Sequence, residues 1–263
     1  MMHNLKKDYH LHPRILNPIE PFDAFVHAAL RKGIKKICVT DHMPLSVSNA
    51  SDRIPKGKIK EYCQKVRELA KRYEGTISIQ CGIEIDYHPL VLGEIEQVLE
   101  EGNFDYVLGS SHMHIFVRDH SAYTFNDFAS LAIENSIRAA ECGWFHAISH
   151  FDMYRFAFEN PHRFPLINDG YNVLKHELQI RTFLKTISQN RVLLEINPHL
   201  AEEKGDLSYV YPQEQIVQWA LEENCTFSYG SDAHHSESVG TYLNVLEAHS
   251  VYGKALKRWN ASF

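Results

Sequence analysis

The sequence predicts an α/β fold in which seven parallel strands, each followed by a helix, close into a barrel. A short apolar run, a polar cluster and a helical pattern recur seven times along the chain. Such alternation is typical of a parallel sheet covered by helices. Each polar cluster directly follows its apolar run, at the carboxyl end of the predicted strand. In a barrel these ends meet at one mouth, whereas an open, doubly wound sheet would spread them along a crevice. The pattern therefore favours the barrel.

The predicted strands are short runs rich in Val, Ile, Tyr and Phe, which favour extended backbone. Each run ends at a polar or charged residue, which marks the point where the chain leaves the sheet. The first strand ends within residues 8–12, and the other six are predicted at residues 36–40, 77–81, 106–109, 146–149, 192–196 and 226–230.

The predicted helices lie between these strands, where apolar residues recur three and four positions apart. Gly33, Gly75 and Gly143 stand where three of these helices are expected to end. We interpret the apolar stripes as core packing rather than as ligand sites. They cover residues 22–30, 59–73, 125–137, 174–187 and 216–221.

The composition is that of a globular protein with one core, and we expect a single barrel domain over residues 1–263. Hydrophobic residues make up 44% of the 263 residues, and the formal net charge is −6. The absence of a basic excess gives nucleic-acid binding no support. The five cysteines, Cys38, Cys63, Cys81, Cys142 and Cys225, form no C-x-x-C pair. They indicate free thiols in a reducing compartment.

No signal peptide or membrane span is expected. Residues 1–10 have no apolar core of signal-peptide length, and no stretch approaches the ~20 apolar residues that cross a bilayer. The sequence therefore predicts a cytoplasmic protein with no membrane partner.

The chemistry is predicted to lie in histidines and carboxylates at the strand ends. His10 and His12 are two residues apart on a strand, so both rings can face one ion. Glu84 follows an apolar strand, and a buried carboxylate is either paired or bound to a metal. Each residue alone has an ordinary alternative, such as a chance H-x-H pair, a salt bridge or a structural histidine. Together six of the seven strand ends carry potential ligands, with the further ones at His42, His112 and His114, His150, Asp232 and His234.

So many ligands exceed the needs of one ion, because zinc takes about four and octahedral ions about six. The sequence therefore predicts two or three clustered divalent ions, with zinc, manganese or iron as the candidates. Clustered ions generate a metal-bound hydroxide nucleophile near neutral pH and hold phosphoryl oxygens. This predicts a phosphoester hydrolase.

The chain resembles the polymerase-and-histidinol-phosphatase (PHP) superfamily. Within that superfamily it resembles the monofunctional bacterial histidinol-phosphate phosphatases of histidine biosynthesis. The resemblance rests on seven motifs in family order, which are DYHLH (8–12), VTDH (39–42), GIEIDY (82–87), GSSH (109–112), SHFD (149–152), LEIN (194–197) and GSDAH (230–234). It implies a distorted (β/α)7 TIM-like barrel and a small phosphorylated substrate.

The resemblance also implies a role for each ligand residue. The first metal would be held by His10, His12, Glu84 and Asp232, and the second by Glu84, His112 and His150, so that Glu84 bridges them. A third would be held by His42 and His234, and Asp8 and Asp41 would orient neighbouring histidines. We expect Glu84, Asp232 and His234 to be the catalytic residues.

Two stretches depart from the family pattern. Many relatives supply another third-metal ligand shortly after the first H-x-H, where residues 13–18 offer only Asn17. The phosphatase branch often has an arginine shortly after LEIN, and residues 198–204 contain none. Arg155 is therefore the predicted substrate-phosphate ligand, with a surface salt bridge as its alternative and Arg14, Arg118 and Lys204 as weaker candidates.

Three functions remain open. The first is a histidinol-phosphate phosphatase, and the second is a phosphoesterase of the same superfamily that acts on another phosphomonoester or a nucleotide. The third is a non-catalytic metal-binding protein, which the dispersal of ligands along the chain disfavours, because structural metal sites usually draw on adjacent loops.

Overall fold

The computed structural model describes residues 6–48 and 50–262, and it contains a seven-stranded parallel sheet whose strands pair in chain order. At the end of β1, the N–H of His12 donates to the carbonyl of Ala233 (2.9 Å) and the N–H of Asp232 donates to the carbonyl of His10 (2.8 Å). The last strand thus meets the first, and the predicted (β/α)7 barrel is confirmed. The strands are β1 (Lys6–Leu11), β2 (Ile34–Val39), β3 (Ser78–Asp86), β4 (Tyr106–Ser110), β5 (Ala147–Ile148), β6 (Leu193–Ile196) and β7 (Phe227–Tyr229).

The barrel is distorted at β3, the longest strand. Its first half, from Ser78 to Cys81, pairs with β2, and its second half, from Gly82 to Asp86, pairs with β4. Gly82 lies at the junction, where a Cβ would approach the Sγ of Cys38 to 2.6 Å and the carbonyl of Tyr106 to 2.9 Å. Only glycine therefore allows the strand to pass between its two neighbours at this point.

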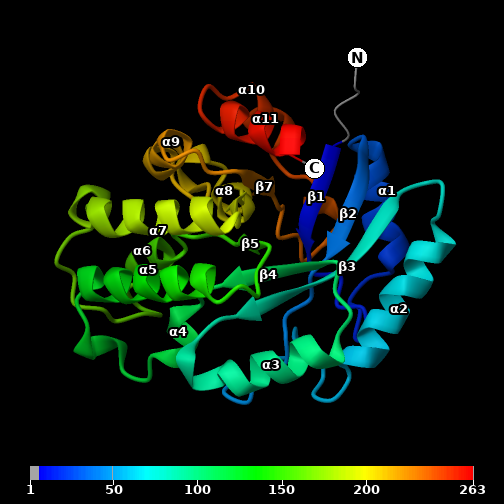
Figure 1. Cartoon of the computed structure of the whole chain (residues 1–263), viewed down its shortest axis with the longest axis horizontal. Coiled ribbons are helices and arrows are strands. Elements are labelled where there is room, and N and C mark those ends of the chain that lie inside the picture. The colour runs from blue at the N-terminus through cyan, green and yellow to red at the C-terminus, as the bar shows by residue number, and fades with distance from the viewer. Residues whose placement is uncertain (1–5, 49, 263) are drawn as a thin grey trace.

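Helices surround the sheet, and five of them coincide with the predicted apolar stripes (Figure 1). These are α1 (Phe22–Arg31), α2 (Ile59–Arg72), α5 (Phe125–Glu141), α7 (Glu177–Asn190) and α9 (Glu214–Glu222). The stripe from residue 174 begins in a 3₁₀ turn, Val173–His176, before α7. The other helices are α3 (Leu92–Glu101), α4 (Met113–Phe116), α6 (Tyr154–Glu159), α8 (His199–Lys204), α10 (Leu243–Ala248) and α11 (Tyr252–Ser262).

Aromatic side chains pack between β1, β4 and α11, toward the amino ends of the strands. The ring of Tyr9 on β1 packs edge-on against Tyr106 at the start of β4, with centroids 5.1 Å apart. It also contacts Trp259 of α11 at 5.4 Å, and the Nζ of Lys7 lies 5.0 Å from the Trp259 ring centroid. All three rings are buried. This end of the barrel is therefore closed by packing.

Within residues 6–48 and 50–262, every helix falls short of the length and apolarity needed to cross a bilayer. The prediction that the chain begins without a signal peptide concerns residues 1–10, of which residues 1–5 lie outside the described part of the structure.

Candidate metal centre

The carboxyl ends of the strands bring all eight predicted metal ligands together. They form three groups whose potential ligand atoms lie within 4.8 Å of one another. The groups are His10, His12 and Asp232; Glu84, His112 and His150; and His12, His42 and His234.

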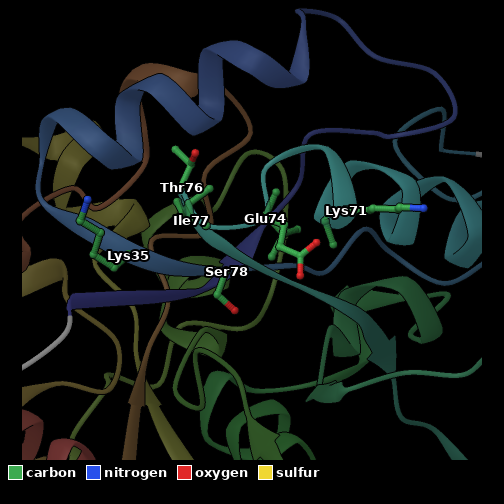
Figure 2. Close-up of a pocket in the computed structure, with 9 residues that line it drawn as sticks. Lys35, Lys71, Glu74, Thr76, Ile77 and Ser78 are labelled. Atoms are coloured by element: carbon green, nitrogen blue, oxygen red, sulfur yellow. The ribbon is translucent and has the colours of Figure 1, made fainter.

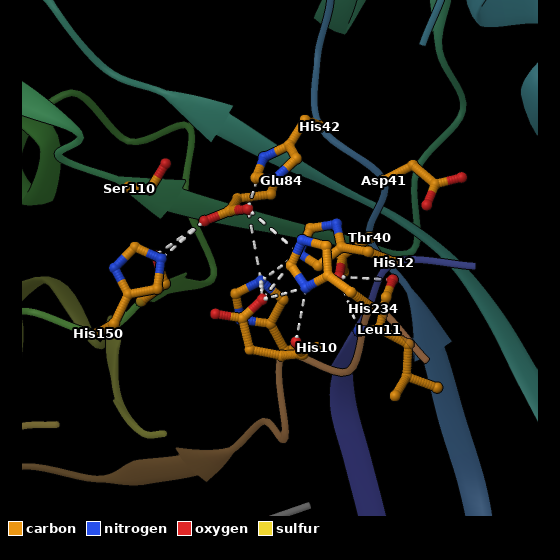
Figure 3. A network of polar contacts seen from close by, with 12 residues as sticks. His10, Leu11, His12, Thr40, Asp41, His42, Glu84, Ser110, His150 and His234 are labelled. Atoms are coloured by element: carbon orange, nitrogen blue, oxygen red, sulfur yellow. Dashed lines mark hydrogen bonds and ion pairs between the residues drawn. The ribbon is translucent and has the colours of Figure 1, made fainter. Parts of the chain in front are cut away.

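Glu84 lies at the centre of these groups (Figure 3). Its Oε2 atom is 2.8 Å from the Nδ1 of His42 and 3.4 Å from the Nε2 atoms of both His10 and His12. Its Oε1 atom faces the other way, 2.9 Å from the Nε2 of His150. The two oxygens of one buried carboxylate therefore point at different histidine groups, which is the geometry that a bridging ligand needs.

His12 belongs to two of the groups. Its Nε2 atom lies 3.1 Å from the Oδ1 of Asp232, and its ring stacks on those of His42 and His234, with centroids 4.3 and 4.5 Å away. The family resemblance implied only His42 and His234 for the third metal. In the structure His12 lies with them as an additional histidine. Asn17 is exposed.

The donor set fits transition-metal ions. The Nε2 atoms of His10 and His12 approach each other to 2.8 Å, with carboxylate oxygens of Glu84 and Asp232 beside them. The Oε2 of Glu84 and the Nδ1 of His42 are buried and lack a well-oriented hydrogen bond. Imidazole nitrogens and carboxylate oxygens that converge in this way are suited to zinc, iron or manganese.

Two ligand histidines are oriented by carboxylates that the sequence did not reveal as functional. The Nδ1 of His10 lies 2.8 Å from the Oε1 of Glu195, and the Nδ1 of His112 contacts the Oδ1 of Asp86. An imidazole that donates one N–H to a carboxylate presents its other nitrogen to a metal in a fixed direction. The available signal was that both carboxylates lie at strand ends, with Asp86 two residues beyond Glu84.

Asp8 and Asp41 are held by backbone amides beside the centre. Asp8 accepts backbone N–H groups from Ser231 (2.9 Å) and Gly240 (2.8 Å), so it joins β1 to the segment after β7. Asp41 accepts those of Arg14 (2.9 Å) and Ile15 (2.8 Å). Both carboxylates therefore fix loops beside the centre, and their implied role in orienting histidine rings stays a prediction.

The segment after β7 is shaped to fit the centre. A Cβ on Gly230 would clash with the Cβ of His10 and with Oε1 of Glu195, so glycine leaves room for that pair. Asp232 takes a left-handed backbone conformation (φ 57°) that costs a non-glycine residue free energy. Such outliers concentrate where a side chain must be aimed at a site.

His114, grouped with His112 from the sequence, lies outside the three metal groups. Its ring packs edge-on against Phe164, with centroids 5.4 Å apart. Burial, followed by the charge of His112, lowers the pKa of His114 to about 3. His114 is therefore held neutral in an apolar pocket beside the centre.

Each of the three guanidinium nitrogens of Arg155 lies near a protein oxygen atom. Its Nε lies 2.7 Å from the Oδ2 of Asp152, and its two Nη atoms donate to the carbonyls of Ser208 (3.2 Å) and Val210 (2.9 Å). These buried contacts join α6 to the segment that follows α8. The phosphate-binding role stays a prediction, and it would require the guanidinium to leave these partners.

Burial and neighbouring groups act in opposite directions on the ionisable side chains of the centre. Burial alone would raise the pKa of Glu84, but the charges of His42 and His10 hold it well below its ordinary value. Burial opposes the charged form of His12 too, but hydrogen bonds to Asp232 and Glu84 raise its pKa to about 9. Metal ions would therefore replace protons when they bind.

A hollow of about 630 Å³ lies elsewhere on the molecule, between the end of α2 and the start of β3 (Figure 2). It is lined by Lys35, Lys71, Glu74 and Ser78, among others, and contains one carboxylate and no histidine. Ser78 begins the strand whose opposite end carries Glu84 and Asp86. The hollow is thus separate from the metal centre.

The sequence matches the PHP domain family over residues 8–199. It is 27% identical over 229 residues to a probable histidinol-phosphatase of Deinococcus radiodurans, a match that covers 82% of this chain and 81% of that protein. It is 25% identical over 280 residues to the histidinol-phosphatase of Bacillus subtilis, covering 92% and 98%.

Among solved structures, the fold resembles a histidinol phosphate phosphatase from Lactococcus lactis subsp. lactis, crystallised with zinc, L-histidinol and phosphate. The TM-score is 0.74 at 19% identity, and the match covers 95% of this chain and 93% of that one. A putative histidinol phosphatase from Listeria monocytogenes gives a TM-score of 0.72 at 17% identity, covering 91% and 99%. At these identities the likeness is one of fold.

Proposed function

This chain belongs to the PHP domain family, and on that premise we propose that it is a metal-dependent phosphomonoesterase whose substrate is histidinol phosphate. The observation that carries the proposal is the two-sided contact of Glu84, whose Oε1 faces His150 at 2.9 Å while its Oε2 faces His42 at 2.8 Å. A carboxylate shared in this way suits two neighbouring ions, and paired ions are used in phosphoester hydrolysis.

When bound, such ions supply an acidified water molecule and positive charge beside the phosphoryl oxygens. The side chains of the centre hold the ligands and handle protons. We propose that the Asp232 carboxylate accepts the proton lost by the attacking water, and the Asn197 amide, which donates to its Oδ2 (3.2 Å), holds that side chain in place. His234 donates its Nδ1 proton to the Asp232 carbonyl (2.9 Å), which leaves its unprotonated Nε2 available to a metal.

Histidinol phosphate is favoured as the substrate by the relatives. Two of them are described as histidinol-phosphatases, and a fold relative was crystallised with L-histidinol and phosphate. Identities of 25–27% leave room for a different phosphomonoester or a nucleotide. The alternative is supported by residues 198–204, which lack the arginine expected there. The formal net charge of −6 speaks against a long nucleic acid.

The test is a substrate panel on protein reconstituted with Zn²⁺, Mn²⁺ or Fe²⁺. The panel should contain histidinol phosphate, a nucleoside monophosphate, a sugar phosphate and an aryl phosphate. We expect the highest kcat/KM for histidinol phosphate. Faster turnover of another phosphomonoester would keep the chemistry and replace the substrate, whereas no turnover of any ester by metal-loaded protein would remove the hydrolase proposal.

Arg155→Ala tests the predicted phosphate ligand. Loss of a charged hydrogen-bonding fork should lower kcat/KM by roughly ten- to a hundredfold on all substrates, with unchanged metal content. Because Arg155 also pairs with buried Asp152 (2.7 Å), thermal unfolding must be measured in parallel. A destabilised variant with unchanged kcat/KM would assign Arg155 to structure alone.

A further inference from the structure

We infer that Arg53 is a positioning residue for the second metal group: it anchors Asp86, and Asp86 orients His112 toward Glu84 and His150. The inference rests on the proposed metal-dependent function. It assigns a specific task to residues 43–58 of the loop between β2 and α2, the part after His42, in which the sequence offered no candidate.

The loop is attached directly to the centre. Arg53 forms a parallel bridge with His42, and His42 forms another with Glu84. The N–H of Ile54 donates to the carbonyl of His42 (2.9 Å), and the N–H of Met43 donates to the carbonyl of Glu84 (2.9 Å). The backbone therefore carries Arg53 to the edge of the ligand-bearing strands.

The side chain of Arg53 turns inward and is 7% exposed. Its Nη1 donates to the Oδ2 of Asp86 (2.6 Å) and to the carbonyl of Met43 (3.0 Å). The Asp86 side chain is fully buried, and a buried carboxylate requires a cation or several donors to remain ionised and fixed. Arg53 supplies that cation.

Asp86, held by Arg53, in turn contacts and orients His112. While its Oδ2 is held by Arg53, its Oδ1 contacts the Nδ1 of His112. The Oγ of Ser110 lies 3.4 Å from the same Oδ1, at the long end of hydrogen-bond distance. With its Nδ1 occupied, His112 has its Nε2 available to an ion shared with Glu84 and His150.

The first metal group is oriented by different means. Glu195, which contacts the His10 ring, accepts the backbone N–H of His150 (3.0 Å) and the side-chain amide of Asn197 (3.1 Å). These two donors lie just after β5 and just after β6, and neither belongs to an arginine. Loss of Arg53 should therefore weaken one metal group and spare the other, a selectivity that general destabilisation would not produce.

The experiment titrates metal-free protein with Co²⁺, followed by its visible absorption, and measures bound Zn²⁺ by elemental analysis. Arg53→Met keeps the length of the side chain and removes its charge. We expect one ion to bind ten- to a hundredfold more weakly, the usual cost of losing a group that orients a ligand, while the remaining ions bind as in the wild type. Arg53→Lys should restore part of the affinity.

Arg67→Met is the control, because Arg67 forms a more exposed arginine–aspartate pair with Asp105 (2.5 Å), and its loss should leave every metal affinity unchanged. Asp86→Asn should weaken the binding of the same ion. The double variant should bind that ion no more weakly than Asp86→Asn alone, since Arg53 acts through Asp86.

Three results would each overturn the inference: wild-type metal affinity in Arg53→Met, equal weakening of the binding of all ions, or additive losses of affinity in the double variant. If Arg53→Met does not fold, Arg53→Lys and the Asp86 variant decide by the same titration. Failure of the wild type to bind metal would instead contradict the proposed function.

Discussion

Tyr9 and His10 are neighbours on β1, yet they belong to two opposite layers of the barrel. Tyr9 joins the packed rings of Tyr106 and Trp259 toward the amino ends of the strands. His10 joins Glu84, Asp232 and Glu195 at the carboxyl ends. The aromatic layer is stabilised by burying apolar surface, whereas the ligand layer buries charges that are tolerated only through mutual pairing or metal binding. Packing and ligand chemistry are thus assigned to adjacent residues of the same strand.

The largest expected effect lies in the ligand layer. Glu84→Gln keeps the shape of the side chain but removes the charge that His10, His42 and His150 face. We expect kcat/KM to fall by on the order of a thousandfold, corresponding to ~3–5 kcal/mol for breaking a buried charge pair. Metal content should fall with it. Near-normal turnover with full metal content would show that Glu84 serves only as an ion-pair residue.

Trp259→Ala tests the opposite layer. Removing this buried ring should lower the free energy of unfolding by about 3–5 kcal/mol, the usual range for an aromatic core truncation. Denaturant unfolding measures the loss. Metal stoichiometry and kcat per folded molecule should stay near wild type, and a loss of bound metal in the folded protein would show that the two layers are coupled.

Metal removal should act on the ligand layer alone. An ion present at a hundred times its dissociation constant stabilises the folded state by about 2.7 kcal/mol. Chelation should therefore lower the melting temperature of the wild type and of Trp259→Ala by similar amounts, and that of Glu84→Gln by much less. Equal shifts in all three proteins would contradict the assignment of the metals to this layer.

Metal affinity should depend on pH through the ligand histidines. The pKa of His12 in the metal-free centre is raised to about 9, so below that pH the ring carries a proton that a metal must displace. Affinity should rise with pH and level off near pH 9, by at most about tenfold per pH unit for each proton released, or ~1.4 kcal/mol. Metal titrations between pH 6 and 9 measure the slope, and a flat profile would mean that the histidines are already neutral.

The smallest effect is expected outside both layers. Arg67 and Asp105 form a partly exposed pair on the outer surface, with side-chain exposures of 41% and 30%. Such a pair contributes about 0–1 kcal/mol, so Arg67→Met should barely change the melting temperature or kcat/KM. A loss of stability comparable with that of Trp259→Ala would show that this surface pair contributes more to the free energy of unfolding than its exposure suggests.

Much of this arrangement could be predicted from the sequence. The seven strand ends, the five apolar helices and the eight candidate metal ligands follow from local patterns, because side-chain direction repeats with the period of each element. Ligand chemistry is likewise a property of residue type, so His10, His12 and Glu84 could be selected without coordinates.

Only the tertiary structure decided which groups contact and orient those side chains. Glu195 reaches His10 across 185 positions, Arg53 reaches Asp86 across 33, and Arg155 is held by carbonyls more than 50 residues away. The sequence also did not predict that β3 pairs with β2 in its first half and with β4 in its second. Nor did it predict that the His114 ring packs against Phe164, outside the metal groups. The free energy of a buried charge depends on whichever groups the fold brings within a few ångströms, and local sequence carries no record of those neighbours.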